Sequence, residues 1–225
     1  IVEQDFNSYV MENVLFKISF PAEFHAQTAV ECALLHHTNV EDKLEQVDRI
    51  VIETQEAAIR IIDKQGPLHN PADRDHCLQY MVAIGLLFGA LTAEHYEDNI
   101  AQDPRIDALR EKMQVSENTV FSEEYLDPDK RSIGNSIQIY FKDGSETEKI
   151  SVDYPIGHSR RREEGIPLLM SKFSDAITKY FPENQATDII DICNNQDDFI
   201  NMKVTDFMQA YCFDTASTTT ARQSE

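Results

Sequence analysis

The chain has 225 residues, 41% of them hydrophobic, and its 20 basic and 40 acidic side chains give a formal net charge of −20. This length allows one large or two small domains with hydrophobic cores, and the negative charge argues against nucleic acid or an anionic membrane surface as a partner. The first ten residues lack the basic and apolar regions of a secretory signal, so we expect no signal peptide.

The four cysteines, Cys32, Cys77, Cys193 and Cys212, are widely spaced and form no C-x-x-C pair. This pattern predicts neither a disulfide framework nor a zinc ribbon nor an iron–sulfur cluster. We therefore expect no bound metal and a reducing, cytoplasmic compartment. The longest uncharged run, residues 77–91, is too short to span a bilayer, so we expect no membrane partner.

The first predicted elements surround a proline. Residues 12–20 are rich in Val, Ile and Phe and predict a strand or extended segment that stops at Pro21, with Lys17 inside it. A helix is expected from His25 onward, with small and branched apolar residues on its buried stripe. A polar link then leads to a predicted strand at about 47–54.

The stretch from Asn70 to Tyr80 is the most unusual part of the sequence, because it gathers titratable side chains directly before the long uncharged run. Asn70 fits an N-cap, Pro71 fits the first helical position and Gly89 fits a C-terminal stop, so we expect one helix of about five turns. Its uncharged second half predicts burial on most sides. Four side chains would share one face of that helix: Asp73, His76, Cys77 and Tyr80.

The neighbouring segments are predicted with less regular patterns. Residues 55–62 favour a helix, Thr92 is expected to cap a short one, and an Asp-Pro pair predicts another over residues 103–113. Residues 114–132 are loop-like.

The clearest β signal is a hairpin at residues 135–154, whose two strands flank an Asp-Gly turn. Ile137, Ile139 and Phe141 would face one way. Three helices are expected after the hairpin, at residues 166–181, 183–193 and 204–213. Strands and helices mix without a βαβ rhythm, so we expect the α+β fold class.

Two regions carry candidate acid–base groups. Lys17 and His25 would place a cation and an imidazole at one loop, and a histidine near a helix N-terminus tends to be neutral, as a general base must be. The alternative is a surface lysine with a capping histidine. In the second region, Tyr80 or His76 could act as general acid or base in a water-poor site. The alternative there is a core tyrosine on a helix that Asp73 stabilises at its N-terminus.

A third candidate region is the dense basic cluster His158, Arg160 and Arg161, which stands out in an acidic chain. Arginine binds carboxylate or phosphate groups in a bidentate way, so an anionic small molecule is the favoured ligand. The alternative is a patch of salt bridges with Glu163 and Glu164.

Four longer strings point to a family: MENVLFKISFPAEFHAQTAVE, NPADRDHCLQYMVAI, YEDNIAQDPRIDALREK and YPIGHSRRREEGIP. They closely resemble the MmgE/PrpD family over about residues 6–213, and they match only the C-terminal half of such enzymes. The resemblance implies a hydro-lyase that converts 2-methylcitrate to 2-methyl-cis-aconitate in the 2-methylcitrate cycle of propionate catabolism. It also implies a homodimer that uses no iron–sulfur cluster or other cofactor.

The resemblance implies a smaller α+β domain of a two-domain, mostly helical dehydratase fold. Residues 1–16 would end the helical domain, residues 17–157 would form the α+β domain, residues 158–213 would rejoin the helical domain, and residues 214–225 would be a disordered tail. This half alone would expose an apolar surface and lack activity.

Site residues follow from the resemblance by position. The expected catalytic residues are Lys17, His25 and Tyr80. The expected substrate-binding residues are Lys17, His158, Arg160 and Arg161. The expected supporting residues are Asp73, Arg74 and His76. Two other interpretations stay open, a related polycarboxylate decarboxylase or epimerase of the same fold, and a non-catalytic acidic interaction module.

Overall fold

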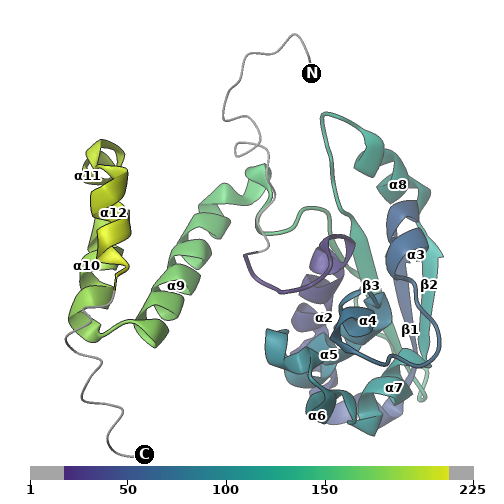
Figure 1. Cartoon of the computed structure of the whole chain (residues 1–225). Helices are drawn as coiled ribbons and strands as arrows, with labels where there is room; N and C mark the ends of the chain where they lie inside the picture. The colour runs from purple at the N-terminus through teal and green to yellow at the C-terminus, as the bar shows by residue number, and fades with distance from the viewer. Residues whose placement is uncertain (1–17, 213–225) are drawn as a thin grey trace, which may run out of the picture. The chain divides into compact units, whose positions relative to one another are not determined.

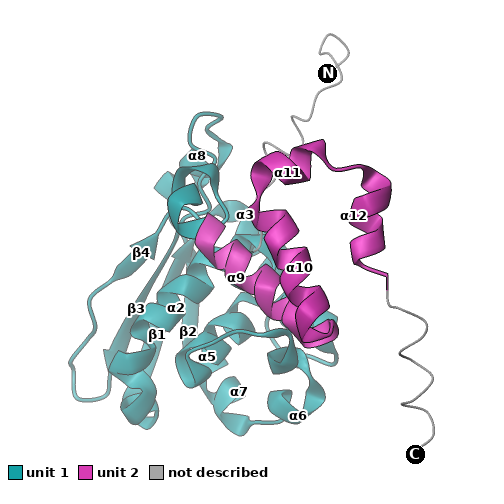
Figure 2. Cartoon of the chain, turned by 90° about the vertical axis from the view of Figure 1, so that its left-hand side faces the viewer, with its two compact units in different colours: residues 1–165 teal, residues 166–225 magenta. Residues whose placement is uncertain are grey.

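A computed structural model describes residues 18–212 of the chain, and these residues fall into two compact units that meet between residues 165 and 166 in the sequence (Figures 1 and 2). Each unit is described by itself. Lys17, most of the predicted segment 12–20 and the predicted tail 214–225 lie outside the described residues. Residues 18–20, which are described, form no strand.

The first unit is built on a four-stranded mixed sheet. Its strand order is β2 (Met113–Glu117), β1 (Val47–Thr54), β3 (Asn135–Phe141) and β4 (Ile150–Val152), with β1 parallel to β2 and every other pair antiparallel. The parallel pair requires a long crossover, which residues 55–112 supply with helices. The α+β fold class is therefore confirmed.

One face of the sheet is apolar because alternate residues point the same way. Ile52 pairs with Ile137 and Ile50 with Ile139, and all four side chains are buried. The predicted hairpin is also confirmed. Gly144 has a φ of 85° in its turn, a backbone conformation that favours glycine.

Two helices form the core layer of this unit. Helix α2 (Gln27–Val40) contacts β3 and β4, and α5 (Leu78–Phe88) packs on α2. A Cβ added at Gly85 of α5 would lie 2.9 Å from Cβ of Ala33, so the helices approach more closely than a larger side chain permits. Short 3-10 turns flank α2, η1 (Phe24–Ala26) before it and η2 (Glu41–Gln46) after it.

The expected single helix after Asn70 is wrong, because the chain breaks it in two. Helix α4 (Pro71–Asp75) ends before His76, and Cys77 has an extended backbone (φ −125°, ψ 106°) before α5 begins. The break leaves His76 exposed on the outside while α5 enters the core. The predicted common face of Asp73 and Tyr80 therefore does not exist. The two predicted ends are confirmed, since the Asn70 side chain caps α4 and Gly89 ends α5 with a φ of 62°.

Residues 114–132 were expected to be a loop, and this expectation is also wrong. They contain most of β2 and the helix α8 (Thr119–Leu126), whose N-terminus is capped by Asn118. Both elements bury little apolar surface of their own, and Phe121 is the buried residue of α8. With so few buried positions, the hydrophobic periodicity of this segment is too weak to predict a strand or a helix from the sequence.

The remaining elements of the first unit are short. The helix predicted for 55–62 is α3 (Glu56–Ile62), and Thr92 caps η3 (Ala93–Tyr96) as expected. The helix predicted for 103–113 is shorter and becomes α7 (Pro104–Arg110), because Met113 already belongs to β2. The other short elements are α6 (Asp98–Ala101) and η4 (Ser159–Arg161).

The second unit is a set of helices around a small core. Helix α9 (Arg162–Tyr180) leads into it, followed by α10 (Glu183–Asn194), α11 (Gln196–Asn201) and α12 (Val204–Ala210). The first two confirm predicted helices, α12 is shorter than predicted, and α11 was missed. The core residues are Ile177, Ala186 and Ile189.

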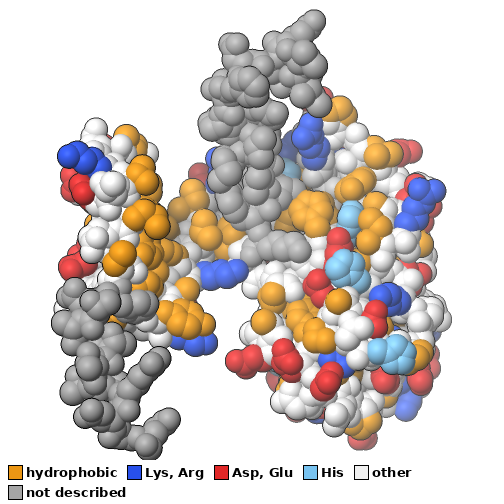
Figure 3. Space-filling view, viewed as in Figure 1, with side chains coloured by type: hydrophobic (Ala, Val, Ile, Leu, Met, Phe, Trp, Pro, Cys, Tyr) orange, Lys and Arg blue, Asp and Glu red, His pale blue; other side chains and the backbone are white. Residues whose placement is uncertain are grey.

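Apolar side chains also remain on the surface of this second unit, where they are visible in Figure 3. Its large hydrophobic side chains that are more than half exposed are Ile166, Tyr180, Ile200, Val204 and Met208. Such surface is typical of helices that pack on another partner. Within residues 18–212, no helix combines the length and apolar character that crossing a membrane requires.

Candidate functional site

His25 lies in the 3-10 turn η1, directly before α2, and is 7% exposed. Glu23 caps that turn, and its carboxylate accepts from the His25 backbone N–H at 2.8 Å. The same carboxylate lies 2.9 and 3.2 Å from Nδ1 of the imidazole. One acidic residue therefore fixes both the backbone and the ring of His25.

The charge of Glu23 sets the tautomer that we assign to the ring. Burial would raise the pKa of Glu23, but the hydrogen bonds and charge of His25, with a smaller effect of His76, outweigh burial and lower it. An ionised carboxylate only accepts, so Nδ1 carries the hydrogen that faces it. In the neutral ring, Nε2 is then the nitrogen with a lone pair.

Tyr125 of α8 lies at that second nitrogen. Its hydroxyl is 3.2 Å from Nε2 of His25, and the two rings are 5.6 Å apart. The sequence interpretation missed Tyr125 because it treated the whole segment as a loop. The Asn-Thr pair at the start of α8, a good N-cap signal, could have revealed the helix that carries it.

The backbone of His25 is tied to the sheet through Asn135, the first residue of β3. The Asn135 side-chain amide donates to the His25 carbonyl at 2.9 Å and to the Thr28 hydroxyl at 2.7 Å. Both Asn135 and Thr28 are fully buried. The position of His25 is thus fixed by hydrogen bonds that join η1, α2 and β3.

Tyr80 is a core residue of α5. It is 2% exposed, its hydroxyl donates to the His95 carbonyl at 2.6 Å, and its ring stacks on Tyr96. Burial raises the pKa of Tyr80 to about 12. This geometry agrees with the core-aromatic alternative, and a catalytic role for Tyr80 stays a prediction.

The three expected supporting residues have different surroundings. Asp73 accepts from Lys64 at 3.1 Å and from backbone and cap groups of its own turn. Arg74 is buried and donates to the Tyr96 carbonyl and to Asp98, so it holds the turn that contacts Tyr80. His76 is about half exposed, and its charge helps to lower the pKa of Glu23.

The basic cluster is folded around Tyr154. His158 is buried beside that ring at 4.6 Å, and its Nδ1 accepts from the backbone N–H of Arg160 at 3.1 Å. Burial, followed by the charge of Arg160, lowers the pKa of His158. Arg160 is exposed, lies over the same ring at 5.0 Å, and donates from Nη2 to the Asp129 carbonyl.

Arg161 is engaged by protein carboxylates. Its two terminal nitrogens each lie 2.9 Å from an oxygen of Glu31 on α2, and it also donates to Glu164 at 2.7 Å and to the Tyr154 carbonyl. The hydrogen bonds of Glu31 and Glu164 raise the pKa of Arg161. For this residue the salt-bridge alternative is present, with Glu164 as predicted and Glu31 as an unpredicted partner.

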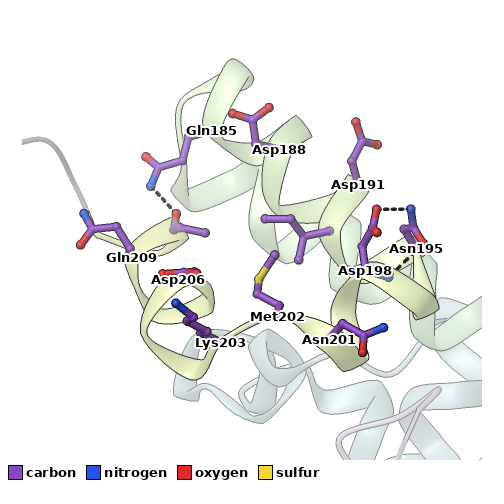
Figure 4. A pocket seen from close by; sticks show the side chains of 12 residues that line it. Gln185, Asp188, Asp191, Asn195, Asp198, Asn201, Met202, Lys203, Asp206 and Gln209 are labelled. Carbon is purple, nitrogen blue, oxygen red and sulfur yellow. Dashed lines mark hydrogen bonds between the residues drawn. The ribbon is translucent and has the colours of Figure 1, made fainter.

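Each unit contains a hollow that is large enough for a small ligand. One, of about 420 Å³, lies between α3 and α8 and is lined by Tyr125, Ser122 and Arg60 among others. The larger, of about 980 Å³, lies among α10, α11 and α12, with Met202 at its centre and several aspartates around it (Figure 4). Acidic walls repel a polycarboxylate, and no described predicted site residue lines this larger hollow. Within residues 18–212, no group of three or more potential metal ligands was found.

The model of the MmgE/PrpD C-terminal domain matches residues 20–198 of this sequence. The chain belongs to the MmgE/PrpD family. The predicted family is thus confirmed, and the described fold is that of its C-terminal domain.

Several proteins named 2-methylcitrate dehydratase are similar in sequence to this chain. A 2-methylcitrate dehydratase from Yarrowia lipolytica, named as mitochondrial, is 57% identical over 93% of this chain and 40% of its own length. A 2-methylcitrate dehydratase from Escherichia coli K12 is 51% identical over 93% of this chain and 44% of its own length. A probable 2-methylcitrate dehydratase from Saccharomyces cerevisiae is 51% identical over 92% of this chain. The chain thus spans less than half the length of these relatives.

Proposed function

We propose that this chain is the C-terminal part of a hydro-lyase that removes water from 2-methylcitrate to give 2-methyl-cis-aconitate in propionate catabolism. The observation that carries the proposal is the identity of 57% and 51% to two proteins named 2-methylcitrate dehydratase, each across 93% of this chain. The geometry around His25 supplies a group suited to the reaction.

Dehydration of a hydroxy-tricarboxylate requires a base for a weakly acidic C–H, an acid for the departing hydroxyl, and cations for the carboxylates. His25 can supply the basicity for the first task, directly or through a hydroxyl bonded to it, because Glu23 holds Nδ1–H and leaves Nε2 to accept a proton. Once the ring accepts a proton, the adjacent Glu23 carboxylate stabilises the imidazolium. His25 is part of the turn η1, and Glu23 is the cap of that turn.

The carboxylate-binding residues differ in how well their surroundings suit the task. Arg160 is exposed and donates to a main-chain carbonyl, so its guanidinium can take on a substrate carboxylate without breaking an ion pair. Arg161 would first have to leave Glu31 and Glu164. We therefore favour Arg160 for carboxylate binding, with His158 as the residue that shapes its turn. Lys17 stays proposed as a further cation on the resemblance alone.

The proposed assembly is a homodimer without nucleic acid or membrane partners, in the cytoplasm. The net charge of −20 supports the exclusion of nucleic acid. Because the Yarrowia relative is named as mitochondrial, the compartment requires a direct test by fractionation.

The test uses the full protein, including the region that corresponds to the remaining length of the relatives. Formation of the conjugated product is followed by its ultraviolet absorbance, in wild type and in His25→Gln, with the exposed His69→Gln as matched control. We expect turnover in wild type and the control, and a loss of about 10²- to 10⁴-fold in His25→Gln.

Three results would contradict the proposal or its site. Release of carbon dioxide would indicate a decarboxylase, and inversion of a stereocentre without a double bond would indicate an epimerase. A wild-type rate in His25→Gln would remove His25 from the mechanism. Binding of a protein partner without any turnover would favour the interaction module.

A further inference from the structure

We propose that Tyr125 is a catalytic residue that works with Glu23 and His25 as a proton relay, an inference that rests on the proposed function. In this relay the phenolic oxygen of Tyr125 takes the proton from the substrate while its own proton passes to His25. His25 would then act on the substrate through Tyr125 rather than directly.

The three side chains form an unbroken line of hydrogen bonds. The Glu23 carboxylate is 2.9 Å from Nδ1 of His25, and Nε2 is 3.2 Å from the Tyr125 hydroxyl. With Nδ1–H directed at Glu23, Nε2 accepts, so the Tyr125 O–H points at the imidazole. The lone pairs of the phenolic oxygen then face away from His25. A base oriented by a third group and bonded to a hydroxyl is the arrangement that activates hydroxyls in many enzymes.

The direct route to His25 is occupied in this geometry. Its Nδ1 is bonded to Glu23 and its Nε2 to Tyr125, and the side chain is almost fully buried. A substrate carbon would have to displace Tyr125 to reach Nε2. Tyr125 itself is only partly buried and lines the hollow of about 420 Å³ between α3 and α8, so it can be approached from outside.

Three of the other charged side chains on the helices around His25 are paired with residues outside the relay. Glu31 on α2 is paired with Arg161, and Glu56 on α3 lies 3.2 Å from Arg60 of the same helix. On α8, Glu124 is paired with Lys130. The remaining titratable groups on these helices are Cys32, His36 and His37 on α2 and the exposed Glu123 on α8. His76 is the further group whose charge acts on Glu23.

The relay returns every proton that it takes up. The C–H proton moves to the Tyr125 oxygen, the phenolic proton moves to Nε2, and the C–H electron pair becomes the new double bond as the C–O bond breaks. The departing hydroxide takes one proton back through Tyr125 and leaves as water. Tyr125 and His25 return to their neutral forms, and no oxidant or further reactant is needed.

The experiment compares the full protein with Tyr125→Phe and with Tyr125→3-fluorotyrosine, whose phenol is more acidic. Tyr140→Phe is the matched control, because Tyr140 is also partly buried and its hydroxyl bonds to Gln138 within the sheet. Initial rates are measured across pH, and thermal melting checks folding. We expect Tyr125→Phe to lower kcat by about 10²- to 10⁴-fold with little change in KM. The fluorinated protein should stay folded and active, with its pH–rate profile moved to lower pH.

The outcomes separate the two proposals. If wild type produces no conjugated product, the proposed function fails, and the relay fails with it. If wild type turns over and Tyr125→Phe keeps the wild-type kcat and pH profile, the relay alone is refuted. If Tyr125→Phe melts at a much lower temperature than wild type, its loss of activity could come from unfolding, and the test then rests on the 3-fluorotyrosine protein. A pH–rate profile of that protein that matches wild type refutes the relay.

Discussion

Replacing Glu23 with glutamine tests whether its carboxylate prepares His25 for proton transfer. The carboxylate lies 2.9 and 3.2 Å from Nδ1, so it forms a charge-assisted hydrogen bond as soon as the ring is protonated. Such bonds contribute about 1.5–3 kcal/mol. If that stabilisation is present in the transition state, its loss lowers kcat about 10- to 150-fold, because about 1.4 kcal/mol corresponds to tenfold in rate.

The assay for Glu23→Gln is the same absorbance measurement across pH, with the exposed Glu45→Gln as control. The amide carries no charge and can donate to Nδ1, so the ring loses both its ion partner and its fixed tautomer. We expect kcat to fall and KM to change little. A kcat within about twofold of wild type would refute the reasoning that Glu23 holds His25 as a base.

The same substitution has a pH-dependent effect on stability. The pKa of Glu23 is lowered from its ordinary value of 4.5, so the folded state gains stability above that pH and loses it as the pH falls through the lowered value. Glu23→Gln should therefore be less stable than wild type at neutral pH, and the gap in melting temperature should narrow below pH 4.5. A gap of constant size across this range would show that the carboxylate charge is not its source.

Other substitutions test the packing and the remaining site predictions. Gly85→Ala should lower the melting temperature, because overpacking against Ala33 costs about 1–3 kcal/mol and outweighs the gain of about 1 kcal/mol in helix propensity; an unchanged or higher melting temperature would contradict the close contact of α2 and α5. Arg160→Ala should raise KM with little loss of stability, whereas Arg161→Ala should cost about 1–3 kcal/mol in unfolding free energy by leaving its carboxylate partners unpaired; the reverse pattern would exchange their roles. Tyr80→Phe should cost about 0.5–1.5 kcal/mol in unfolding free energy for the lost hydrogen bond. A fall in kcat in the same variant would assign Tyr80 the catalytic role that the resemblance implies, and an unchanged kcat would remove it.

Elements with strong local signals could be predicted from the sequence. The hairpin at 135–154 has alternating apolar residues and a glycine with positive φ in its turn, and both features act over a few residues. The caps at Asn70 and Gly89 are likewise local. The break between α4 and α5 is different, because neither proline nor glycine stands at residues 76–77. At the end of α4, the buried Arg74 donates to a turn more than twenty residues later in the sequence. A contact over that distance leaves no trace in the helical periodicity of residues 70–89.

The same distinction applies to the site. Glu164 could be predicted as a partner of Arg161 because it lies three residues away on a helix, but Glu31 is separated from it by 130 residues. His25 could be singled out by its place near a helix start. Its partner Tyr125 could not, because α8 was not recognised and the contact joins residues 100 positions apart.

The proposed acid–base groups all lie within the first unit. They come from three elements: η1 with its cap Glu23 supplies His25, α8 supplies Tyr125, and β3 supplies the amide of Asn135. The imidazole is therefore held in its orientation by residues of this chain alone. The proposed activity also needs residues that bind the substrate carboxylates. An arrangement that is fixed before substrate arrives avoids the cost of ordering it during the reaction. If Glu23, His25 and Tyr125 form the proposed relay, its proton-transfer groups are therefore oriented by the first unit of this chain before substrate binds.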